Sequence, residues 1–172
     1  MKVDLIKNFV LVSFISIIVT RLIPHPPNFT STLALAFYLP VLFGRKFLLV
    51  AIVAFIIGDL IIGIHQLIFF TWGSLMLVGF FAKYFKKNYY RFLGVTLSCI
   101  MFFFISNFGV WLFSDIYNPN FQGLILCYYM ALPFLQNTLI SSLFFALAIE
   151  LLININSAKI FIRKINPSYN FN

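Results

Sequence analysis

The sequence predicts an all-α polytopic membrane protein with six transmembrane helices, and three observations support this fold class. Hydrophobic residues make up 62% of the 172 residues and charged residues only 9%. The mean hydropathy is +1.02, far above the range of soluble proteins. Apolar stretches alternate with short connectors that carry most of the Lys and Arg residues. Because each crossing takes about 20 residues, we expect one transmembrane domain over residues 1–172.

The first predicted helix covers residues 5–22. Lys2 and Lys7 precede its apolar run as in a signal peptide, but no small-residue cleavage site follows near Thr20, so we expect a retained helix. Ser13, Ser16 and Thr20 recur at helical spacing and would let a neighbouring helix approach closely.

Residues 21–30 then read Arg-Leu-Ile-Pro-His-Pro-Pro-Asn-Phe-Thr, which we call the proline segment. Its three prolines remove backbone donors and fix φ, so it cannot continue a helix. The second predicted helix, residues 30–43, is short for a hydrocarbon core of about 30 Å. This shortfall predicts that the proline segment folds into the protein.

The remaining apolar runs predict four more helices. The third covers residues 47–62 and the fourth 66–82, joined by a tight turn that carries Asp59 and His65. The fifth covers residues 92–113 and ends in a turn-rich connector, residues 114–122. The sixth covers residues 123–153, and Pro133 is expected to bend it.

The positive charges predict the orientation of these helices. Of the twelve Lys and Arg residues, Arg21 alone falls on one side of a six-helix alternation. The other eleven are Lys2, Lys7, Arg45, Lys46, Lys83, Lys86, Lys87, Arg91, Lys159, Arg163 and Lys164. The positive-inside rule therefore places both termini in the cytoplasm, and we expect a multi-pass protein of the cytoplasmic (inner) membrane. This pattern also argues against a role in nucleic-acid binding.

This topology brings unusual polar residues together on the outer side. Ionisable and amide side chains are costly near lipid and are therefore candidates for a functional site. The candidate ligand-binding residues are Arg21, His25, Asn28, Asp59, His65, Asn107, Trp111 and Asn137.

Several of these residues also have a structural interpretation. Arg21 could form an ion pair with Asp59 or Asp115 that joins the first helix to the third or fifth, or it could bind an anionic ligand group. Asn107 and Trp111 could hold a flat ligand, or serve helix packing and the membrane interface. Asn137 follows the Pro133 bend, an arrangement found at transporter sites and also in plain helix packing. Glu150 is expected to meet the basic connectors.

Metal-dependent and enzymatic functions find little support. His25, His65 and Asp59 could form a metal site, but their separations are not diagnostic, and we predict neither a metal nor a cofactor. Gly58-Asp59 is similar to part of the Gly-x-Gly-Asp motif of intramembrane aspartyl proteases, but Ile56 and Ile57 offer no glycine. No zincin, nucleophile-elbow or Walker motif occurs. Cys99 and Cys127 are expected to be buried thiols without a disulfide.

Four segments together resemble a known family. They are Pro24–Thr30, Gly58–His65, Asn107–Trp111 and the pair Pro133-Phe134 with Asn137-Thr138. They look like a family of small uncharacterised bacterial membrane proteins, which is similar to the substrate-binding S components of energy-coupling-factor transporters. The resemblance covers about residues 17–150.

The resemblance implies a six-helix bundle with a pocket that opens outward beneath the first outer loop. Such proteins bind a vitamin-like small molecule and depend on a transmembrane coupling subunit with paired ATPases. S components commonly present an alanine-rich face on their first helix, where this chain has Ser13, Ser16 and Thr20. We therefore expect a membrane-embedded solute-binding or uptake subunit, with a non-catalytic membrane scaffold or assembly subunit as the alternative.

Overall fold

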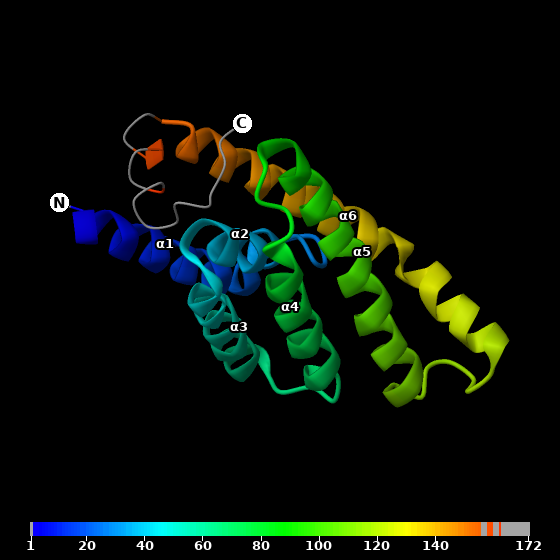
Figure 1. Ribbon diagram of the computed structural model, residues 1–172. Helices are drawn as coiled ribbons and strands as arrows, with labels where there is room; N and C mark the ends of the chain where they lie inside the picture. Colours follow the sequence, from blue (N-terminus) through cyan, green and yellow to red (C-terminus); the bar gives the residue numbers. More distant parts are fainter. Residues whose placement is uncertain (1, 156–157, 160–161, 163–172) are drawn as a thin grey trace.

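A computed structural model describes residues 2–155, 158–159 and 162, and within them the chain is helical without strands. The six α-helices and one short 3-10 helix follow the predicted order (Figure 1). Their bounds are α1 Lys2–Leu22, α2 Thr32–Phe43, η1 Arg45–Phe47, α3 Leu48–Ile62, α4 Ile68–Ala82, α5 Asn88–Phe113 and α6 Phe121–Ile153. The predicted set of six helices is therefore confirmed, with boundaries that differ by a few residues.

The short α2 forms the centre of the bundle. All twelve of its residues are buried, and it packs against α1, α3, α4, α5 and α6. A helix that is apolar on every face is stable when protein surrounds it on every face. The helix α2 can therefore be short because other helices enclose it. A helix that faced lipid would need more residues to cross the membrane.

The long helices α5 and α6 form an antiparallel pair that extends beyond the ends of the other helices (Figure 1). Within the described residues these two are long and apolar enough to cross a membrane, over Tyr90–Phe113 and Phe121–Ile153. The helices α2 and α4 are apolar but shorter. Membrane association is thus indicated by length and composition.

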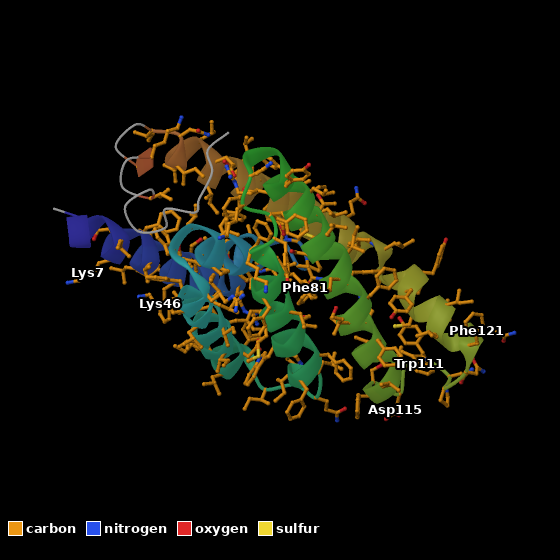
Figure 2. All side chains as sticks on the ribbon, viewed as in Figure 1. Lys7, Lys46, Phe81, Trp111, Asp115 and Phe121 are labelled. Carbon is orange, nitrogen blue, oxygen red and sulfur yellow. The ribbon has the colours of Figure 1, made fainter. Side chains whose placement is uncertain are left out.

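The outer surface of the bundle is apolar. Large hydrophobic side chains are exposed along α1, α3, α4, α5 and α6, including Phe69, Phe121 and Tyr129, which are 80%, 74% and 68% exposed. Soluble monomers seldom expose apolar surface so continuously. Lys7 and Lys46 lie at one end of the molecule and Trp111, Asp115 and Phe121 at the other (Figure 2). Arg163 and Lys164 lie outside the described residues.

The proline segment meets α6 well inside its length. Asn137 donates its side-chain N–H to the carbonyl of Pro27 at 3.0 Å, and the Ser141 hydroxyl donates to the carbonyl of Asn28 at 3.4 Å. Both donors lie near the middle of α6. The segment therefore contacts the middle of the longest helix, as an inward fold predicts, but Ile23, Pro24, Pro26, Pro27 and Asn28 remain exposed.

Two smaller predictions are also confirmed. The hydroxyl-bearing face of α1 contacts the start of α2: Ser16 donates to the Ser31 hydroxyl at 3.0 Å, and the Ser31 backbone N–H donates to Thr20 at 3.2 Å. Cys99 and Cys127 are buried free thiols.

Candidate ligand-binding site

Asp59 is the centre of a polar cluster formed by α1, α3 and α4. It is 1% exposed, and each of its carboxylate oxygens accepts a hydrogen bond. Arg21 Nη2 at the end of α1 donates to Oδ1, and Trp72 Nε1 of α4 donates to Oδ2 at 2.7 Å. The predicted ion pair therefore joins α1 to α3, and the partner of Arg21 is Asp59 and not Asp115.

Two neighbours on α3 fix the position of the Arg21 guanidinium. Its central carbon lies 3.8 Å from the centroid of the Phe55 ring, a cation–π contact. Gly58 leaves the space for its stem, because a Cβ at position 58 would lie 2.8 Å from Arg21 Nε and 3.2 Å from Cδ. The side chain is 14% exposed. Arg21 is thus held from three sides by Phe55, Gly58 and Asp59.

A cavity of about 250 Å³ adjoins this cluster. Its lining comes from all six α-helices, the proline segment and the α3–α4 connector. The lining residues are Arg21, His25, Asn28, Thr30, Thr32, Leu33, Phe55, Ile62, His65, Thr71, Phe102 and Thr138. The cavity is bounded by polar groups around the proline segment and by apolar side chains of α3 and α5, a mixture typical of small-molecule sites.

The proline segment presents its polar residues to the cavity through a compact turn. The Phe29 N–H donates to the Pro26 carbonyl at 2.9 Å, and the Thr30 N–H donates to the Asn28 carbonyl at 3.0 Å. Asn28 has φ of +64°, a left-handed conformation that Asn adopts more readily than most residues. Asn28 therefore serves the turn through its backbone and is also one of the lining residues of the cavity.

The two histidines of the lining are oriented by local hydrogen bonds. His25 Nδ1 lies 2.6 Å from the Pro26 carbonyl, which can only accept, so Nδ1 is the donor. His65 Nδ1 accepts from the Leu67 N–H at 3.2 Å. When both rings are neutral, His25 therefore has an acceptor at Nε2 and His65 a donor at Nε2.

The predicted site residues separate into two groups. Arg21, His25, Asn28 and His65 line the cavity. Asp59 is not a lining residue, and both of its oxygens already accept hydrogen bonds from Arg21 and Trp72. Asn137 is not a lining residue either, but it supports the proline segment by donating to the Pro27 carbonyl.

Asn107 and Trp111 do not line the cavity, contrary to the prediction that they contribute to its walls. Asn107 donates to the Phe103 carbonyl of its own helix at 2.8 Å, and Trp111 donates to the Asn118 carbonyl of the α5–α6 connector at 3.0 Å. Trp111 lies at the far end of the molecule (Figure 2). Two residues on the predicted outer side thus bond within or beside their own helix and take no part in the lining.

Sequence reasoning missed Trp72 and Thr71 on α4 and Phe55 on α3. Trp72 holds the second oxygen of Asp59, and Thr71 and Phe55 line the cavity. Asp59 lies on α3 and not in the turn where it was expected, and a usable signal existed because Trp72 lies in the first turns of the next helix, α4. A tryptophan there can reach back to a carboxylate at the end of the preceding helix.

A second buried cluster lies between α2, α5 and α6. Glu150 accepts from Arg91 Nε at 2.5 Å, from Arg91 Nη2 at 2.8 Å and from the Tyr38 hydroxyl at 2.7 Å. Arg91 Nη1 donates to the Lys86 carbonyl at 2.7 Å. The prediction that Glu150 meets a basic residue is thus confirmed, but the pair is buried, with Arg91 1% and Glu150 4% exposed.

Among the described residues, no group of three His, Cys, Asp or Glu side chains is placed to hold a metal ion. His25, His65 and Asp59 therefore do not form such a group, and the site is better described by its hydrogen-bond donors and acceptors.

Comparison with known proteins gives one match. A family model described as a family of unknown function (DUF6580) matches residues 4–160. No curated protein and no solved structure matches the chain.

Proposed function

The chain belongs to DUF6580, a family of unknown function, and from that premise we propose that it is a membrane-embedded subunit that binds a small solute for uptake. It would reside in the cytoplasmic (inner) membrane, with six crossings, both termini inside and the cavity open to the outer side. The alternation of charge along the sequence and the apolar surface of five helices support this arrangement.

The observation that carries the proposal is the lining of the cavity. Six helices and two connectors, far apart in the sequence, place polar groups around one hollow of about 250 Å³. Charged and amide groups inside a membrane protein are costly unless they are paired or functional. The volume is just below the ~300–1,000 Å³ of typical ligand pockets, which favours a small solute.

The position of the proline segment also supports the proposal. The proline segment is non-helical backbone held against the middle of α6, near the Pro133 position. Secondary transporters commonly place solutes near the membrane midplane beside interrupted helices. Energy would come from outside this chain, and an S-component-like partnership with a transmembrane coupling subunit and ATPases is the arrangement we favour. Because Ser13 is buried and Ser16 and Thr20 bond to Ser31, this face of α1 is used internally, and such a partner would bind elsewhere.

A scaffold or assembly role is the second candidate. The observation that favours it is the number of predicted site residues used in packing: Asn107, Trp111 and Asn137 all bond to backbone carbonyls. This interpretation accounts for those three residues but does not explain why Arg21, which lines the cavity, has unused hydrogen-bond donors.

The experiment that distinguishes the two roles is mass spectrometry of small molecules that co-purify with the detergent-solubilised protein. We expect wild type to carry a small solute and His65→Ala to lose most of it, because His65 lines the cavity and is exposed enough for the fold to tolerate the change. Gln122→Ala is the matched control, since Gln122 is exposed at the start of α6. Equal solute content in His65→Ala and wild type, or no solute in any of the three, would contradict the proposal.

A further inference from the structure

Arg21 has hydrogen-bond donors at the cavity that have no partner among the described residues. A guanidinium has five N–H donors, and among its three nitrogens only Nη2 makes a hydrogen bond within the described residues. Nε is enclosed against Gly58 without a partner. The remaining donors lie on the terminal nitrogens of a side chain that lines the cavity. The group is therefore only partly satisfied by the protein.

The electrostatic balance of the cavity favours a negative ligand group. No acidic side chain belongs to its lining. The nearest carboxylate, Asp59, is fully buried and already accepts from both Arg21 and Trp72. A cationic ligand would therefore meet the guanidinium without finding a free carboxylate. An anionic group would complete the hydrogen bonding of Arg21.

Neutral groups near Arg21 also favour a negatively charged ligand group. Thr32 belongs to the lining, and its hydroxyl accepts from Thr30 at 3.1 Å and keeps its own hydrogen for a ligand, whereas the Thr71 hydroxyl donates to carbonyls of its own helix. The α2 helix begins at Thr32, and the Ser31 side chain does not cap it. First-turn amides of a helix lack intrahelical partners and favour negative charge. These groups support an anion at the position that Arg21 already defines.

We infer that the solute carries an oxyanion, a carboxylate or a phosphate, which binds the free donors of Arg21 in this cavity. This inference rests on the proposed function and narrows the class of solute. Asp59, Phe55 and Gly58 would act as positioning residues, since they hold the guanidinium before the ligand arrives. Planar guanidinium groups bind such oxyanions through two parallel hydrogen bonds.

The test measures thermal unfolding of the full chain in phosphatidylcholine nanodiscs, with inorganic phosphate, succinate or the neutral succinamide added. We expect at least one of the two anions to raise the midpoint by about 5–10 °C at a hundredfold excess over its Kd. Succinamide should not raise it. A further sample with phosphatidylglycerol and no added anion tests whether a lipid headgroup is the source of the oxyanion.

The variants separate binding from folding. The double variant Arg21→Gln/Asp59→Asn removes both charges and keeps groups able to bond to each other and to Trp72, so it should fold and lose the anion response. Arg21→Lys should retain a weaker response, because it keeps the charge without the planar fork. Arg45→Gln is the control, since Arg45 is an exposed arginine of η1 outside the cavity.

The results expected for and against an oxyanion ligand are distinct. A response to phosphate or succinate in wild type and Arg45→Gln but not in the double variant supports the inference. Stabilisation by phosphatidylglycerol alone, lost in the double variant, assigns the oxyanion to a lipid headgroup and contradicts a free solute. An equal response to succinamide, or an unchanged response in the double variant, overturns the oxyanion and leaves solute binding intact. No response to any probe together with no co-purified solute overturns both.

Discussion

Two arginine–carboxylate clusters in this molecule have similar chemistry and different surroundings. In each, an arginine from one helix meets a buried carboxylate that also accepts a hydrogen bond from an aromatic side chain: Trp72 to Asp59, and Tyr38 to Glu150, both at 2.7 Å. The Arg91 cluster uses all three guanidinium nitrogens. The Arg21 cluster uses one and borders a cavity.

The difference shows how to tell a structural ion pair from a functional one. Buried charges are costly unless geometry and additional hydrogen bonds compensate. The Arg91–Glu150 pair meets this condition within the protein, so it needs no ligand and joins α2, α5 and α6. The Arg21–Asp59 pair has this compensation only in part, because Arg21 has unused donors at the cavity. A bound solute could accept hydrogen bonds from them.

The largest effect on stability is expected from Glu150→Ala, which tests whether the Arg91 cluster is structural. Removing the carboxylate leaves Arg91 charged and buried, so we expect a loss of about 3–5 kcal/mol of unfolding free energy. Chemical or thermal unfolding of the purified protein measures it. The double variant Arg91→Met/Glu150→Leu should recover most of the loss, because no unpaired charge remains. A Glu150→Ala protein as stable as wild type would show that the cluster is not structural.

Gly58→Ala addresses the Arg21 cluster without removing a charge. The new methyl group would lie 2.8 Å from Arg21 Nε, so the guanidinium must shift within the cluster while it stays beside Asp59. We expect solute binding to weaken by tenfold or more, while stability changes by no more than ~1–2 kcal/mol because alanine favours the helix by about 1 kcal/mol. Isothermal titration with the co-purified solute measures the affinity.

Gly73→Ala is the matched control for that substitution. Gly73 lies inside α4, and a Cβ there meets nothing within 4 Å. This variant should be as stable as wild type or slightly more so, with unchanged affinity. A similar loss of affinity in both variants would mean that replacing a helical glycine by alanine weakens solute binding in general. The position of Arg21 would then not be the cause.

The smallest effects are expected at Asn28, where backbone and side chain can be separated. Asn28→Ala puts a residue that tolerates the left-handed region less well than asparagine at φ of +64° and should cost about 1 kcal/mol of stability, whereas Asn28→Gly should cost less. Both remove the amide from the cavity, so both should weaken solute binding by about fivefold, the value of one hydrogen bond. Parallel unfolding and titration experiments measure the two effects. If only Asn28→Ala weakens binding, the side chain does not contact the solute.

The sequence predicted the helices well and the site in part. Six apolar runs gave six helices, because length and hydropathy are local properties. The proline segment and the Asp59 turn were recognised from residues that are unusual in an apolar chain. Asn107 and Trp111 were assigned to the same site from topology alone, which gives the side of the membrane but not the depth.

The sequence by itself therefore determined the helical architecture, the non-helical part of the proline segment after Leu22 and the presence of costly polar groups near it. Only the tertiary structure decided that Arg21 pairs with Asp59, that Trp72 completes the carboxylate, and that Asn137 holds a carbonyl 110 residues away. The physical reason is that helices with apolar residues on every face carry no periodic signal for which face turns inward. Where a polar side chain ends up is then set by packing against distant helices.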